Sequence, residues 1–254
     1  MSSDKSWTEN SKPVEKLNVE ICFLLQGEFY IGNPNSREQI TDPKYREPLS
    51  LPDFARANEK YGTTAEIFGN EEHLAAYYRQ IVERGALIGK SFNELRNYFR
   101  LRLLVWNGME NVSISFPWYD SLTEIRGFTS WLASPQEGAF WDIEQGWQVD
   151  AVQASGFLHI RELDPDSDER YDNVKTALGE VAASAMLEES RAQTIIERLS
   201  DGLGVDVWSK QTKDAPFGTS TWQPNNSINR TPKKQGFFGC LATLGAGYLK
   251  RWAP

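Results

Sequence analysis

Three aspartates at alternating positions are the first residues whose spacing suggests chemistry. Asp164, Asp166 and Asp168 are spaced like the carboxylates that open the calcium-binding loop of an EF-hand. The rest of that loop does not fit, because Glu169 stands where the turn requires glycine and Lys175 stands where a bidentate glutamate belongs. We interpret the segment as a solvated acidic loop or a surface for a basic partner, with a weak cation site as the third alternative.

Paired carboxylates could also serve as the acid and the base of a hydrolase. Asp142, Glu144, Glu162 and Asp164 lie close together in the sequence, beside tryptophans that could stack on a sugar. Their spacing does not show that any two of them meet across a cleft. A hydrolase acting on a carbohydrate-like substrate is therefore an alternative function, and no residue is assigned a catalytic role.

Other common catalytic and metal-binding patterns are missing from the sequence. There is no glycine-rich nucleotide-binding signature, no His-Glu-x-x-His and no Gly-x-Ser-x-Gly. The two histidines, His73 and His159, and the two cysteines, Cys22 and Cys240, give no zinc-ligand spacing. Each cysteine lies in an apolar run, which favours a small buried thiol. We expect no cofactor and no metal, and the sequence favours a protein that is not an enzyme.

The formal net charge of −8 is concentrated in one region. Residues 142–172 carry nine carboxylates against two arginines, whereas nucleic acid and anionic membranes attract clustered lysine and arginine. Four tryptophans lie in or beside the hairpins that flank this region, and aromatic anchors are typical of tight protein interfaces. We therefore expect a basic protein partner and no nucleic acid. The predicted contact surface consists of Asp142, Glu144, Asp150, Asp164, Asp166, Asp168, Trp141 and Trp147.

Hydrophobic periodicity predicts an α+β fold with a mainly antiparallel sheet. Residues 17–31 read as a strand or hairpin, and residues 100–118 and 147–163 alternate on both sides of a short connection, which predicts two hairpins. Capping residues and 3.6-residue spacing predict the helices that pack on this sheet. These helices cover 52–61, the segment from Asn70 to Gly85 or Gly89, the segment 91–99 with its capping box, and a long one near 173–203.

The chain divides into four segments by composition. Residues 1–16 form a polar arm without an apolar signal core, residues 17–208 form the main domain, and residues 209–235 form a linker or surface segment. Residues 236–254 are apolar but shorter than the roughly 20 residues that span a bilayer. We expect this last segment to dock on the core, with peripheral membrane contact or recruitment of the protein to an assembly as alternatives. Low cysteine use favours the reducing cytoplasm.

In composition and layout, residues 17–208 resemble the immunity proteins of bacterial toxin systems. The shared features are an acidic, tryptophan-rich α+β chain, two hairpins, an acidic loop and no catalytic constellation. The likeness is one of layout, so it carries over no functional residue. It implies a protein that binds a cognate toxin and blocks its active site. An acidic patch would steer such a toxin, because toxins that attack nucleic acid are often basic.

Overall fold

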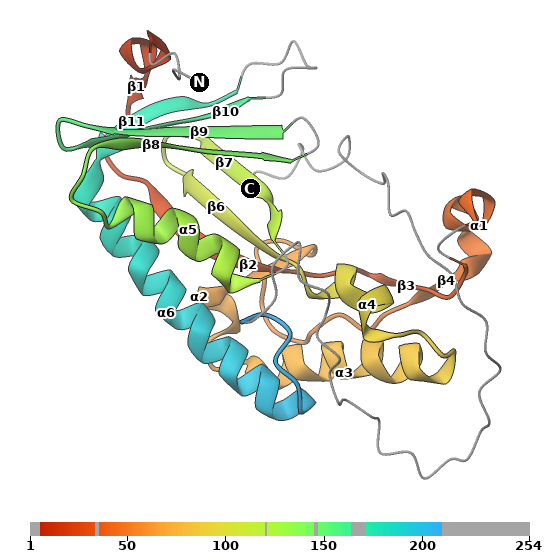
Figure 1. Ribbon diagram of the computed structural model, residues 1–254. Coiled ribbons are helices and arrows are strands. Elements are labelled where there is room, and N and C mark those ends of the chain that lie inside the picture. The colour runs from red at the N-terminus through yellow and green to blue at the C-terminus, as the bar shows by residue number, and fades with distance from the viewer. Residues whose placement is uncertain (1–5, 34–35, 120, 145–146, 164–170, 210–254) are drawn as a thin grey trace.

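The computed structural model describes residues 6–33, 36–119, 121–144, 147–163 and 171–209 (Figure 1). It contains a five-stranded, a four-stranded and a two-stranded sheet, almost entirely antiparallel and packed with helices. The expected α+β class is confirmed. Among the described residues, no helix is both long enough and apolar enough to cross a membrane.

The four-stranded sheet carries the most deeply buried strands. Its order is β5 (Tyr61–Thr63), β2 (Asn18–Leu24), β6 (Leu101–Asn107) and β7 (Val112–Tyr119). The predicted hairpin over 100–118 is confirmed as β6 and β7. The Asn107 side chain stabilises the turn of this hairpin, because its Oδ1 accepts hydrogen bonds from the backbone N–H groups of Met109 and Glu110. One face of this sheet packs on the helices, so it supplies much of the core.

The five-stranded sheet crosses the top of the molecule in Figure 1. Its order is β1 (Lys12–Pro13), β11 (Asn173–Ala177), β10 (Phe157–Leu163), β9 (Trp147–Ala154) and β8 (Gly138–Glu144). The predicted second hairpin is confirmed as β9 and β10. Its turn uses Ser155 and Gly156, which both have positive φ, as a tight hairpin connection requires. β8 and β1 are the two edges of this sheet.

Two of the predicted helices form as expected. α3 (Glu71–Leu87) follows Asn70, and the capping box of Ser91 and Glu94 opens α4 (Phe92–Leu95), which continues into η3 (Arg96–Phe99). Asn70 does not cap α3, because its amide donates to the Glu66 carbonyl instead. The elements that complete the chain are η1 (Ser6–Asn10), β3 (Glu28–Tyr30), α1 (Arg37–Thr41), η2 (Pro43–Tyr45), β4 (Arg46–Pro48), α2 (Thr64–Ile67) and α5 (Leu122–Leu132).

Two helix predictions need correction. The long helix α6 (Leu178–Leu203) does not begin at 173, because residues 173–177 pair with β10 as strand β11. The helix predicted over 52–61 does not form at all: residues 51–60 are irregular and Tyr61 begins β5. At 173–177, pairing with β10 overrides the local helical pattern. A helical pattern confined to a short segment, as over 52–61, gives only weak helix stability.

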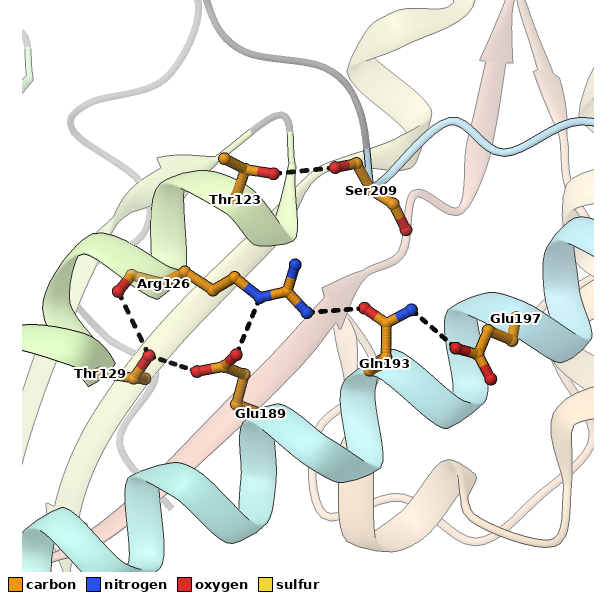
Figure 2. A network of polar contacts seen from close by, with 7 residues as sticks. All are labelled: Thr123, Arg126, Thr129, Glu189, Gln193, Glu197 and Ser209. Carbon is orange, nitrogen blue, oxygen red and sulfur yellow. Dashed lines mark hydrogen bonds and ion pairs between the residues drawn. The ribbon is translucent and has the colours of Figure 1, made fainter. Parts of the chain in front are cut away.

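The last described residues are held firmly against the helices. Trp208 is fully buried and donates its indole N–H to the Phe99 carbonyl at 2.7 Å. Figure 2 shows the neighbouring polar network, in which Arg126 of α5 donates to Glu189 and Gln193 of α6, each at 2.8 Å. In the same view, the Thr123 hydroxyl donates to the carbonyl of Ser209 at 2.8 Å. The described chain therefore ends beside α5 and α6.

Candidate protein-binding site

The β8–β9 hairpin places predicted contact residues on two different faces of the five-stranded sheet. Trp141 lies directly opposite Asp150, so these two share the outer face. Ile143 follows on the same face of β8, because side chains alternate along a strand. Trp141 is 66 % exposed and Ile143 is 45 % exposed, although both are large apolar residues. The outer face thus presents an apolar pair at the edge of the sheet.

Trp147 lies on the opposite, inner face of the sheet. It is only 8 % exposed, and the Arg102 guanidinium lies 5.3 Å from the centre of its ring. Its indole N–H and two nitrogens of Arg102 have no hydrogen-bond partner. Burial lowers the pKa of the Arg102 guanidinium. Trp147 therefore contributes to the interior, and its side chain is not available to a partner.

The two described carboxylates of the predicted surface both have partners within the chain. Arg161 donates its Nε and Nη2 to Asp150 Oδ2 at 3.0 and 2.7 Å. Asp142 lies on the inner face and accepts a hydrogen bond from the Tyr119 hydroxyl. Burial, together with Asp142, raises the pKa of Tyr119. Neither carboxylate is therefore an unpaired surface charge.

The other predicted carboxylates cannot be placed. The side chain of Glu144 and the residues Asp164, Asp166 and Asp168 lie outside the described part of the structure. The strand that leads to the acidic segment is described, and it ends at Leu163, which pairs with Gln148 on β9. The acidic run therefore starts at the end of the sheet where β8 turns into β9.

The edges of the two larger sheets next to this hairpin differ in one respect. On β7, the outward N–H groups of Ser113 and Ser115 donate to Asp172 Oδ2 at 2.8 Å and to Glu162 Oε2 at 3.3 Å. On β8, by contrast, no such hydrogen bond joins the outer edge to another described residue. An exposed edge of this kind can accept an added strand. The difference was not visible in the sequence, because the capping carboxylates come from distant positions.

No protein-family model, curated protein or solved structure matches this chain. Its function is therefore inferred from the geometry of its own residues. Within the described ranges, no three side chains of His, Cys, Asp or Glu gather in a way that could hold a metal ion.

Two of the carboxylates considered for a hydrolase, Asp142 and Glu162, occupy one row of the inner face. Asp142 pairs with Val149, and Val149 pairs with Glu162 on the next strand. Two strand spacings separate the backbones of Asp142 and Glu162 by about 10 Å. Glu162 is buried, and its hydrogen bond to the β7 edge gives it a structural task.

A second carboxyl pair was not anticipated from the sequence. Glu20 lies on β2 near Glu188 of α6, and burial, followed by the charge of Glu188, raises the pKa of Glu20 to about 7. Glu188 itself accepts from the Thr64 hydroxyl and forms an ion pair with Arg191. Glu20 Oε2 is buried without a hydrogen-bond partner. The available signal was a glutamate between two core residues, Val19 and Ile21, of a buried strand.

Proposed function

We propose that this is a non-enzymatic binding protein whose strand β8 receives an extended segment of a basic protein partner. The observation that carries the proposal is the β8 edge, to which no described residue hydrogen-bonds from outside and which bears Trp141 and Ile143 exposed on one face. An added strand would form backbone hydrogen bonds along this edge. Its alternate side chains would contact the tryptophan and the isoleucine, which would supply the specificity.

The charge of the chain supports a basic partner. Nine of its carboxylates fall within residues 142–172, and the acidic run begins at the end of the sheet where β8 turns into β9. Clustered negative charge speeds the encounter with a positive surface and disfavours acidic competitors. A basic toxin inhibited by this protein, as the likeness to immunity proteins implies, is the partner that we propose.

The test compares two double variants of the tagged full chain. Trp141→Ala with Ile143→Ser changes the β8 surface, whereas Met109→Ala with Leu87→Ala changes two exposed apolar residues elsewhere. A basic protein captured from the native cell is purified, and its affinity for each variant is measured by titration calorimetry. We expect the β8 variant to weaken binding at least about tenfold and the control variant to leave it unchanged.

Two results would overturn the proposal. One is equal affinity of the β8 variant and the parent protein for the purified partner. The other is a stoichiometric partner that is acidic and binds with no dependence on salt, since steering by opposite charge predicts weaker binding at higher ionic strength.

The row formed by Asp142 and Glu162 favours a carboxylate-based hydrolase as the second candidate function. Its test is hydrolysis of a panel of aryl glycosides by the parent protein and by Asp142→Asn. Turnover that is lost in this variant would support the hydrolase, and no turnover by the parent protein would remove it.

A further inference from the structure

A second apolar surface lies on the helical side of the molecule, away from β8. We define the α2–α6 groove as the hollow of about 420 Å³ lined by Ala65, Phe68, Leu187, Ser190, Arg191 and Thr194. Phe68 and Leu187 are each 51 % exposed. The volume lies within the range of about 300–1,000 Å³ that is usual for binding pockets. The groove is thus large enough to hold bulky side chains.

The charged groups around the groove are already paired. Arg191 forms an ion pair with Glu188, and Arg198, whose guanidinium lies 5.6 Å from the centre of the Phe68 ring, forms one with Glu71. When an apolar segment enters the groove, each of these arginines therefore keeps its carboxylate partner. This avoids the main cost of covering a charged side chain.

We propose that the C-terminal apolar segment of this same chain, residues 236–254, docks in the α2–α6 groove. The segment contains three aromatic residues within its first thirteen, Phe237, Phe238 and Tyr248, together with several leucines. It has the apolar side chains that such a groove buries favourably. Its length is below that of a membrane span.

The point at which the described chain ends favours this occupant. Ser209 is bonded to Thr123 of α5, and α5 is joined through Arg126 to Glu189 and Gln193 of α6 (Figure 2). The groove residues Ser190 and Thr194 each directly follow one of these two α6 residues. The groove therefore lies on a neighbouring face of α6. Because a helix with its side chains is only about 10–12 Å wide, the separation between this contact and the groove is short.

The connecting residues are numerous enough to bridge this separation. Residues 210–235 number 26, and a flexible chain of that length has a root-mean-square span of about 28 Å. A tether of this kind gives an effective concentration in the millimolar range. The segment would therefore compete well against dilute partners in solution.

Opposite charge also favours docking of the C-terminal residues on the rest of the chain. Residues 210–254 carry seven lysines and arginines and one aspartate, whereas residues 1–209 carry 20 basic and 34 acidic residues. The basic tail is therefore attracted to the acidic body of its own chain, although at a range limited by salt to about 8–10 Å. This attraction favours docking on an acidic body, and the covalent connection favours the body of the same chain over that of a second copy.

The native cysteines make the proposal testable in the full chain. Cys240 lies in the proposed docking segment, whereas Cys22 is buried, and burial raises the pKa of its thiol, so it should not react. Ser190→Cys places a second thiol in the groove. Met109→Cys, at a residue that is 90 % exposed on the β6–β7 turn, is the matched control. A short bismaleimide then reports which thiol lies near Cys240.

We expect cross-linking within one chain to be at least about tenfold faster for Ser190→Cys than for Met109→Cys, and independent of protein concentration. Adding Leu187→Asp should reduce the rate to that of the control, whereas Leu87→Asp, at an exposed residue of α3, should not.

Three outcomes would overturn the proposal. Equal rates at the two positions would show that the segment does not favour the groove. Cross-links between chains that increase with protein concentration would assign the groove to a second copy. Equal rates combined with sedimentation of the protein on phosphatidylserine vesicles would assign the segment to a membrane surface.

Discussion

Strands β7 and β8 are both edge strands, but hydrogen bonds from other described residues cover only the outer edge of β7. Both are outermost strands, so each has backbone groups without a neighbouring strand. On β7, Asp172 and Glu162 accept hydrogen bonds from the outward N–H groups. On β8, no described residue does so, and Trp141 and Ile143 lie exposed beside the open backbone.

The difference shows that edge protection is not uniform among the described strands. Open, apolar edges promote aggregation, so proteins usually cover or charge them. Among the described residues, Glu162 and Asp172 cover the edge of β7, whereas no hydrogen bond covers the outer edge of β8. The carboxylates at the β7 edge therefore serve stability, whereas Trp141 and Ile143 on β8 are exposed and form the surface that we propose for binding.

Removing Glu162, the buried carboxylate that caps the edge of β7, should have the largest effect on stability. Glu162→Ala leaves the Ser115 N–H without its acceptor and takes away a carboxylate whose charge favours the buried Arg102 cation. We expect a loss of about 2–4 kcal/mol in the free energy of unfolding, measured by urea denaturation. Glu83→Ala, at an exposed position of α3, is the control and should change it by less than about 0.5 kcal/mol. Equal effects of the two variants would contradict the capping role.

Glu20 contrasts with Glu162. Both are largely buried carboxyls, but Oε2 of Glu20 has no hydrogen-bond partner, whereas Glu162 accepts a hydrogen bond from β7. Its pKa is about 7 in the folded protein and 4.5 as the reference value, so the folded state holds a proton that the unfolded state releases between these two pH values. Stability from this group is therefore complete below pH 4.5, falls as the pH rises, and is lost above about pH 7.

The pH dependence can be isolated with Glu20→Gln. Between pH 4.5 and 8, the parent protein should lose about 1–2 kcal/mol relative to this variant, a figure reduced from the full shift because the group is partly exposed. Denaturation of both proteins at the two pH values gives the difference. A parent protein that gains stability relative to Glu20→Gln as the pH rises would show that the pKa is not raised.

A smaller effect is expected at the second cap of β7. Asp172→Ala removes one hydrogen bond at 2.8 Å from a partly exposed position, which should cost about 1 kcal/mol. Hydrogen exchange at the Ser113 amide should become faster, whereas exchange in the buried strand β2 should remain unchanged. Unaltered protection at Ser113 would mean that this carboxylate does not hold the edge.

The smallest effect on stability is expected on β8. Trp141→Ala and Ile143→Ser should each change the free energy of unfolding by no more than about 0.5 kcal/mol, because both residues are exposed at the surface. A loss above about 1.5 kcal/mol in thermal or urea unfolding would place these residues among the structural ones and remove the contrast with β7.

Local patterns predicted much of the fold. The hairpins β6–β7 and β9–β10 and the capping box before α4 are correct, because each depends on residues close together in the chain. The local pattern predicts helix where strand β11 forms, and it predicts neither β8 nor α5. These elements are stabilised by partners distant in sequence, and such contacts override a weak local preference.

Sequence alone therefore determined the fold class, the two hairpins and the concentration of negative charge between residues 142 and 172. Only the tertiary structure decided which tryptophan is exposed: Trp141 lies on the outer face of an edge strand, whereas Trp147 is buried under Arg102. It also decided that, within the described ranges, carboxylates cap the edge of β7 and none caps that of β8. The physical reason is that exposure and edge protection depend on which distant segments pack together, and residues such as Glu162 and Asp172 reveal that task only when the sheets meet.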